Sequence, residues 1–155
     1  MSDEHDEREA LRVVRAIFEE KIPFNRLLGL TVESLDLERP SVAFAMREDL
    51  VGNFYKGSLH GGVISAALDV TGGLVAFLGL LRVLRGIPLE ERIQRFSRIS
   101  TIDLRVDFLQ PGVGKQFLGA GYILRMGRRV AVTRMELHDD EKRLIAVGTG
   151  AYLVG

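Results

Sequence analysis

A long apolar stretch, residues 61–81, most constrains how this chain can fold, because it carries a single charged side chain, Asp69. The stretch is long enough to cross a lipid bilayer as a helix. A carboxylate near the middle of a membrane span would cost about 2.5 to 3.5 kcal/mol, and five glycines dilute the hydrophobicity of the stretch. The pattern therefore favours the buried central helix of a globular protein, with a membrane span as the alternative.

The residues at the start of this stretch favour chemistry on a carbonyl oxygen. His60, Gly61 and Gly62 suit a close backbone approach at a helix start. The unpaired N–H groups and the positive dipole at such a helix end attract an oxyanion. A charge on an apolar helix is costly unless it has a partner or a role, so Asp69 is a second candidate. Oxyanion donors and a lone carboxylate in one segment indicate acyl transfer.

The spacing of these groups predicts an oligomer. His60 and Asp69 lie nine residues apart, so a helix separates them by about 13 Å along its axis and places them on roughly opposite faces. If both serve one site, the carboxylate must meet the glycine amides of a second copy across a two-fold axis. On that condition, the sequence predicts a homodimer, or a homotetramer made of two dimers.

Several motifs resemble those of the hotdog-fold acyl-CoA thioesterases, both the phenylacetate-pathway type and the medium- and long-chain type. The motifs are Val51-Gly52-Asn53, Gly57-Ser58-Leu59-His60-Gly61-Gly62-Val63-Ile64, Leu68-Asp69, Thr101-Ile102-Asp103-Leu104, Phe108-Leu109-Gln110-Pro111, Gly127-Arg128-Arg129 and Val147-Gly148-Thr149-Gly150-Ala151-Tyr152. The resemblance covers residues 27–154. It implies an α+β hotdog fold, in which a curved antiparallel β-sheet wraps around a central helix, with an extra N-terminal helix. It also implies hydrolysis of an acyl-CoA substrate without a metal or other cofactor.

The resemblance further implies catalytic roles for four residues. Asp69 would act as nucleophile or general base toward the thioester carbonyl, and the Gly61 N–H would polarise the carbonyl oxygen, an interaction worth about 2.7 to 4 kcal/mol. Asn53 and Thr101 would position the lytic water. Asn53 lies seven residues before His60, where several relatives have a spacing of six, so the intervening loop is one residue longer here.

Four more residues are candidates for binding substrate. By the same resemblance, His60 and Gly62 would line the site, and His60 would mainly shape the turn. Arg128 and Arg129 would meet the phosphates of coenzyme A, with Arg125 and the arginines of residues 82–98 as alternatives for that role. Each role has a plain structural alternative: a capped carboxylate for Asp69, tight packing for the glycines, and solvated turn residues for the arginines.

Composition sets the remaining limits. At 155 residues the chain is expected to form one domain, 1–155, with a helical N-terminal extension at 1–26 and a helical insertion at 82–98. Basic and acidic residues both number 21, which gives no argument for a nucleic-acid or membrane-surface partner. The absence of cysteine excludes a thiol nucleophile and fits a reducing cytoplasm. The polar N-terminus has no apolar core of a signal peptide.

Hydrophobic periodicity and turn residues predict the order of elements. The expected elements are a helix at 6–20, a hairpin of strands at 30–37 and 41–47, a loop at 48–59, the central helix at 61–81, and a meander of strands at 100–110, 115–126, 129–137 and 143–153. Two rival functions remain open on this fold. One is a hydratase or dehydratase that pairs His60 with an acid, and the other is an acyl-CoA binding module without catalysis.

Overall fold

The computed structural model describes residues 2–155, so Met1 of the expected N-terminal extension lies outside the described residues. The first half of the described chain holds helix α1 (Ser2–Ala16), the π-helical turn η1 (Ile17–Lys21), helix α2 (Pro23–Leu28), strands β1 (Thr31–Ser34) and β2 (Ser41–Ala45), the 3₁₀ turn η2 (Glu48–Leu50), and strands β3 (Val51–Asn53) and β4 (Ser58–Leu59). The second half holds helices α3 (Gly61–Val83) and α4 (Leu89–Gln94), the 3₁₀ turn η3 (Arg95–Arg98), and strands β5 (Ser100–Phe108), β6 (Gln116–Met126), β7 (Val130–Asp139) and β8 (Leu144–Leu153).

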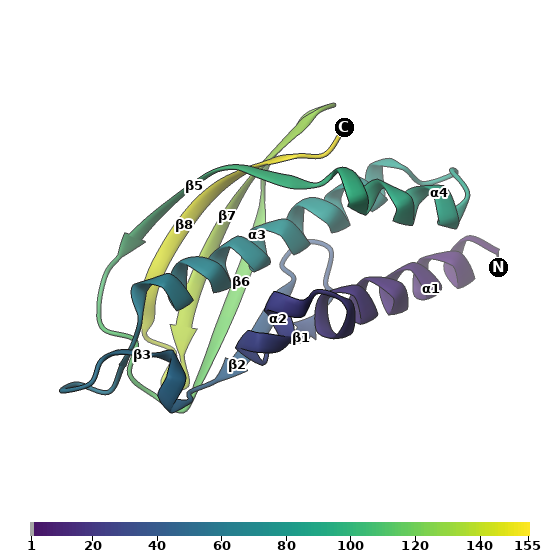
Figure 1. The fold of residues 1–155 in the computed structure, drawn as a ribbon. Helices are drawn as coiled ribbons and strands as arrows, with labels where there is room; N and C mark the ends of the chain where they lie inside the picture. Colours follow the sequence, from purple (N-terminus) through teal and green to yellow (C-terminus); the bar gives the residue numbers. More distant parts are fainter. Residues whose placement is uncertain (1) are drawn as a thin grey trace.

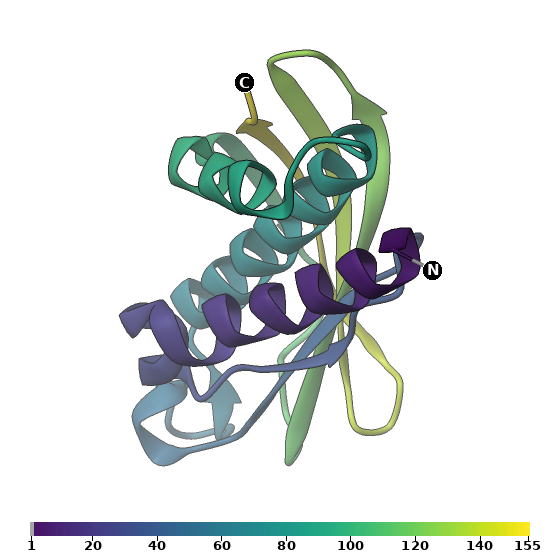
Figure 2. The same ribbon diagram turned by 90° about the vertical axis from the view of Figure 1, so that its right-hand side faces the viewer.

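Six of the strands form one antiparallel sheet in the order β1-β2-β6-β7-β8-β5. The sheet curves around α3, and Figure 1 shows this helix lying across its concave side. Figure 2 shows α1 crossing on the other side of α3, so that the central helix lies between α1 and the sheet. The expected α+β fold with a sheet wrapped around a central helix and an extra N-terminal helix is confirmed.

The position of α3 between two layers explains its composition. Its buried residues include Leu68, Leu74 and Phe77, which are inaccessible to solvent, and a helix covered on both sides is apolar around most of its circumference. The same helix is long and apolar enough to cross a membrane, but 61% of its most apolar window is buried within the protein. Strand β7 packs one face against α3, and buried and partly exposed residues therefore alternate along it.

Two expectations about the strands were wrong in detail. The four strands after α3 do not form a simple meander, because β5 pairs with β8 at the edge of the sheet while only β6, β7 and β8 follow one another. Residues 48–59 are more than a loop, since β3 and β4 form a separate two-stranded ladder. Local patterning predicts each strand but carries no information about which distant strand lies beside it.

The N-terminal helix also differs from its expected form. It begins at Ser2 and ends in the π turn η1, which is closed by a hydrogen bond from the Ile22 N–H to the Ile17 carbonyl at 3.1 Å. Such turns interrupt α-helices and often occur near functional sites. In the segment 82–98, α3 extends to Val83, and α4 and η3 follow after a turn.

Candidate functional site

The carboxylate of Asp69 is held by two hydroxyl groups. Asp69 lies in the middle of α3 and is half-buried. Its Oδ1 accepts hydrogen bonds from Thr101 Oγ1 at 2.9 Å and from the Tyr152 hydroxyl at 3.1 Å. Among residues 2–155, no donor bonds to Asp69 Oδ2. One carboxylate oxygen is therefore fixed by the protein, while the other is left for a water or a substrate.

The pairing of β5 with β8 brings the two hydroxyl groups together. Thr101 and Tyr152 are directly opposite each other in the ladder of these strands, and both side chains reach α3. Gly72 and Gly150 make room for the Tyr152 ring, since a Cβ on either would overlap it. The aromatic side chain is buried at 1% exposure, so its position is defined by packing.

Tyr152 acts as a donor at neutral pH. Burial, and then the negative charge of Asp69, raise the pKa of the Tyr152 hydroxyl far above its ordinary value. The phenol therefore stays protonated and donates to Asp69, whose Oδ1 and backbone carbonyl oxygen both lie 3.1 Å from the hydroxyl. The motif at residues 147–152 contains Tyr152 but does not by itself predict a role for its hydroxyl. A large aromatic with a polar tip on a strand that faces the central helix was the available signal.

Asp69, Thr101 and Tyr152 lie at one side of a cavity of about 240 Å³. The rest of its lining is mostly apolar and comes from η1, α2, α3 and the η3 region. The main apolar contributors are Phe18, Ile22, Phe24, Val70, Phe96 and Ile99. A carboxylate at the edge of an apolar cavity is an arrangement suited to a substrate with a reactive polar group and an apolar tail.

The start of α3 forms a second candidate group. His60 caps the helix, because its Nδ1 accepts the Gly62 N–H at 2.8 Å. The Gly62 amide is thus already used, whereas no residue in the described range 2–155 accepts the Gly61 N–H. The ring of Phe108 lies beside this position, since a Cβ built on Gly61 would be 3.4 Å from Phe108 Cε1. Gly61 therefore offers the free donor at this helix end.

The structure does not bring the Gly61 N–H and the Asp69 carboxylate together in one chain. Eight residues of helix separate them by about 12 Å along the axis. Gly61 is not among the residues lining the cavity that contains Asp69. A single chain therefore presents an acid with its orienting hydroxyls in one place and an oxyanion donor in another.

Three other candidates also lie outside this cavity. Asn53 is exposed, and its Oδ1 accepts the N–H groups of Tyr55 and Lys56 at 3.1 and 3.2 Å. In one chain it thus caps the β3–β4 turn. Arg128 and Arg129 are exposed in the β6–β7 turn, at the end of the sheet where β5 begins and β8 ends.

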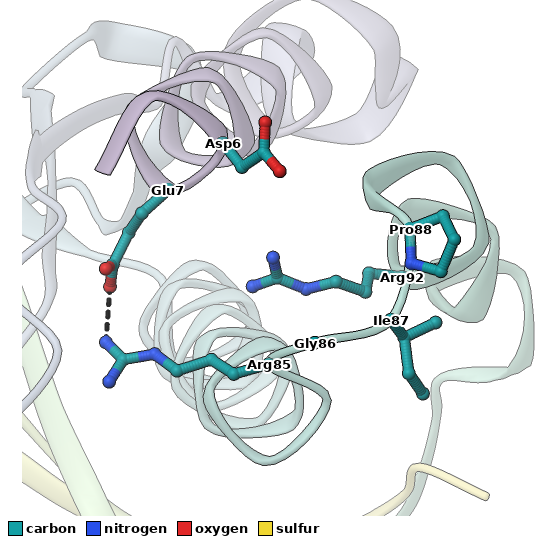
Figure 3. A pocket seen from close by; sticks show the side chains of 7 residues that line it. All are labelled: Asp6, Glu7, Arg85, Gly86, Ile87, Pro88 and Arg92. Atoms are coloured by element: carbon teal, nitrogen blue, oxygen red, sulfur yellow. Dashed lines mark hydrogen bonds and ion pairs between the residues drawn. The ribbon is translucent and has the colours of Figure 1, made fainter. Parts of the chain in front are cut away.

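A further cavity of about 360 Å³ lies between the first turns of α1 and the connection from α3 to α4. Figure 3 shows the Arg92 side chain pointing into it between Asp6 and Arg85. Arg92 is buried, its Nη2 donates to the Leu81 carbonyl at 2.9 Å, and Arg85 pairs with Glu7 at 2.5 Å. The ion pair of Arg85 with Glu7 links α1 to the α3–α4 connection. The negative charges of Asp6 and Glu7 balance the positive charges of Arg85 and Arg92, so this cavity gives no net attraction for an anionic substrate.

The structure also shows no candidate metal centre in the described part of the chain, where no cluster of three or more histidine, aspartate or glutamate side chains is suitably placed. The cavity at Asp69 combines a carboxylate held by two hydroxyl donors with a mostly apolar lining. Its chemistry depends on the carboxylate and its two donors.

Comparisons with known proteins identify the family to which this sequence is similar. Residues 56–146 match the family model described as thioesterase superfamily. The medium/long-chain acyl-CoA thioesterase YigI of Escherichia coli is 45% identical over 147 residues, which cover 95% of both proteins.

Solved structures show the same architecture. A protein from Shewanella oneidensis related to the thioesterase superfamily is 45% identical, with a TM-score of 0.91 over 96% of this chain and 97% of that one. A mutant of the phenylacetic acid degradation protein PaaI from Thermus thermophilus is 25% identical, with a TM-score of 0.66 over 85% of this chain and 98% of that one.

Proposed function

The chain belongs to the thioesterase superfamily, and from that premise we propose that it hydrolyses acyl-CoA thioesters to a free acid and coenzyme A. The observation that carries the proposal is the Asp69 carboxylate, oriented by two hydroxyl donors at the edge of an apolar cavity. The relative YigI is named a medium/long-chain acyl-CoA thioesterase. An apolar cavity next to the acid is consistent with an acyl chain of that class.

Asp69 supplies the reactive group in this proposal. Thr101 and Tyr152 hold Oδ1, so that Oδ2 faces a water or the thioester carbon in a defined direction. As general base, Asp69 takes a proton from water as the water attacks the carbonyl carbon, and the C–S bond then breaks to release the coenzyme A thiolate. As nucleophile, it attacks the carbonyl carbon itself, the C–S bond breaks to release the coenzyme A thiolate, and water then hydrolyses the resulting mixed anhydride to the free acid and the regenerated carboxylate. Thr101 positions the carboxylate in both routes.

The site is completed by a second copy of the chain. Strand β5 is nine residues long and lies at the edge of the sheet, with its outer backbone groups available for pairing. If two β5 strands pair antiparallel about a two-fold axis, the Thr101 end of one lies beside the Phe108 end of the other. Because Gly61 packs against Phe108, this pairing brings the partner's free amide toward Asp69. Each homodimer then has two equivalent sites, and a homotetramer would repeat them.

The remaining candidates keep their proposed roles around this composite site. Asn53 and His60 come from the segment just before α3 and would approach the site together with Gly61. Arg128 and Arg129 would contact the phosphates of coenzyme A. Residues 1–155 would form one domain that works in the cytoplasm, which the cysteine-free composition fits.

Release of thiol tests the proposed activity directly. Incubation with dodecanoyl-CoA and a thiol-reactive chromogen should give one thiol per substrate consumed. Binding of the acyl-CoA without thiol release would instead indicate a non-catalytic binding module. Loss of enoyl absorbance from an enoyl-CoA, without thiol release, would indicate a hydratase. The bond from the Gly62 N–H to His60 Nδ1 argues against that last function, because a neutral imidazole that accepts at Nδ1 carries its proton on Nε2 and has no free lone pair to act as a base.

Mixed dimers test the shared site. One chain carries Asp69→Asn and the other Gly61→Pro, which removes the amide donor. If each site takes its acid from one chain and its amide from the other, the mixed dimer has one intact site and regains about half the wild-type activity, while both parent dimers stay inactive. A fully active monomer in size-exclusion chromatography would contradict the composite site.

A further inference from the structure

Gly73 is a glycine whose presence the packing of the protein does not explain. It lies in the interior of α3, where glycine destabilises a helix relative to alanine. Its neighbour Gly72 is required, because a Cβ there would overlap the Tyr152 hydroxyl. At Gly79 a Cβ would also be crowded, by the terminal methyl of Met126 at 2.6 Å and by Ile123 Cδ1 at 3.1 Å. A Cβ on Gly73 would make only an ordinary contact, 4.0 Å from Tyr152 Cε1.

The place of Gly73 along α3 indicates what its missing side chain leaves free. Gly73 follows Asp69 by four residues, which puts the two on the same face of the helix, about 6 Å apart along the axis. Both residues line the apolar cavity. Space at Gly73 is therefore continuous with the space at the carboxylate.

An aromatic cluster closes the same face one turn further on. Phe77 follows Gly73 by four residues and is fully buried. The ring of Phe96, from η3, lies against Phe77 at 5.1 Å between centroids and against Phe18 at 5.8 Å. Phe96 and Phe18 also line the cavity. Because Phe96 packs on Phe77, which follows Asp69 by eight residues or about 12 Å of helix, the two rings form a cavity wall near this turn of α3.

The wall is held in place by the π turn. Phe18 lies in η1, and its carbonyl accepts a hydrogen bond from Nδ2 of the buried Asn25 at 3.0 Å. Asn25 is 2% exposed, so the contact fixes Phe18 from inside the protein. A fixed aromatic wall defines the length of the cavity.

We propose that Gly73 and Phe96 determine which acyl chains the protein accepts. The acyl chain runs from the thioester at Asp69 along α3, passes through the space left open at Gly73, and ends at the ring of Phe96. This inference rests on the proposed thioesterase function and adds the residues that select its substrate. Gly73 admits the chain, and Phe96 limits its length.

A side chain at position 73 tests the path. The measured quantity is the ratio of kcat/KM for dodecanoyl-CoA to kcat/KM for butanoyl-CoA. Each methylene excluded from an apolar site costs about fourfold in binding, so Gly73→Leu should lower the ratio by at least about tenfold, and Gly73→Ala by less. Gly73→Ala should melt at the same temperature as the wild type or higher, which separates blockage from misfolding. An unchanged ratio in Gly73→Leu overturns the proposal.

A smaller side chain at position 96 tests the wall. Phe96→Leu should shift the preferred chain length upward by one or more two-carbon steps in a series of even-numbered acyl-CoA substrates. Phe44→Leu is the matched control, because Phe44 is a buried phenylalanine that stacks on Phe117 outside the cavity. We expect this control to lower the melting temperature and leave the chain-length profile unchanged. An equal shift in both variants would refute a specific role for Phe96.

Binding of free dodecanoate, measured by calorimetry, makes the test independent of turnover. The wild type should bind this product more tightly than Gly73→Leu by at least about tenfold, by the same methylene estimate. If no acyl-CoA is hydrolysed but this difference is found, the proposed function fails and the acyl path stands. If acyl-CoA is hydrolysed and both proteins bind dodecanoate equally, the acyl path fails and the proposed function stands.

Discussion

Replacing Asp69 by asparagine separates its chemical role from a structural one. Asparagine keeps the shape and the Oδ1 acceptor, so the hydrogen bonds from Thr101 and Tyr152 can persist. It places an amide where Oδ2 stood, at an atom with no protein donor among residues 2–155, and removes the base or nucleophile. Loss of a general base costs about 10² to 10⁴ in rate, which corresponds to about 2.7 to 5.4 kcal/mol of activation free energy.

The same structure predicts a small effect on stability. The two retained hydrogen bonds become weaker when their acceptor is neutral, and removal of a half-buried charge compensates for part of that loss. We expect the free energy of unfolding to change by less than about 1 kcal/mol, or about 2 to 4 °C in melting temperature for a chain of this size. Asp69→Val is the contrasting variant, because it removes the side-chain acceptor of both hydroxyls. The exposed Thr101 hydroxyl can turn to water, and the buried Tyr152 hydroxyl keeps only the Asp69 backbone carbonyl at 3.1 Å, so we expect a destabilisation of about 1 kcal/mol, mostly from Tyr152.

Two measurements on the same samples decide the question. Thiol release from dodecanoyl-CoA gives kcat, and thermal melting followed by circular dichroism gives stability. Asp49→Asn is the matched control, because Asp49 is an exposed carboxylate paired with Arg47 outside the cavity, and it should change neither quantity. If Asp69→Asn melts early while its folded fraction turns over at the wild-type rate, Asp69 is structural and the proposed mechanism is wrong.

The other predictions concern the donors and the coenzyme. Gly61→Pro removes the free N–H at a helical position that tolerates proline, whereas the control Gly61→Ala keeps the N–H. The kcat of the proline variant should be about 10² to 10³ lower than that of the alanine variant, and equal values would exclude this donor. Tyr152→Phe removes one charged hydrogen bond to Asp69, so kcat should fall about tenfold or more and stability by about 1 kcal/mol, as followed by thiol release and melting. Arg128→Gln or Arg129→Gln should raise KM for acyl-CoA and spare a short acyl-pantetheine, whereas equal effects on both substrates would point away from phosphate binding.

The sequence predicted those features of the protein that depend on local chemistry. The His60-Gly61-Gly62 run marks the start of α3 because its residues suit a helix N-terminus. Period-two patterns and turn residues located the strands of the sheet to within a few residues. The place of β5 beside β8 could not be predicted in this way, because strand order depends on how distant segments pack on α3. The contact of Tyr152 with Asp69 could not be predicted for the same reason, since its hydroxyl reaches Asp69 only when β5 and β8 are packed on α3.

A bulge in β5 explains why the orientation of the Thr101 side chain could not be predicted from the sequence pattern. Leu104 and Val106 pack against the core below α3, so strict alternation along the strand would turn Thr101 to the opposite face of the sheet. The register between β5 and β8 shifts between Thr101 and Asp103, and the extra residue, Ile102, is exposed. This insertion reverses the alternation and directs the Thr101 hydroxyl to Asp69. Bulges commonly re-aim a side chain next to an active site, and here one additional residue in an edge strand gives the carboxylate its second donor.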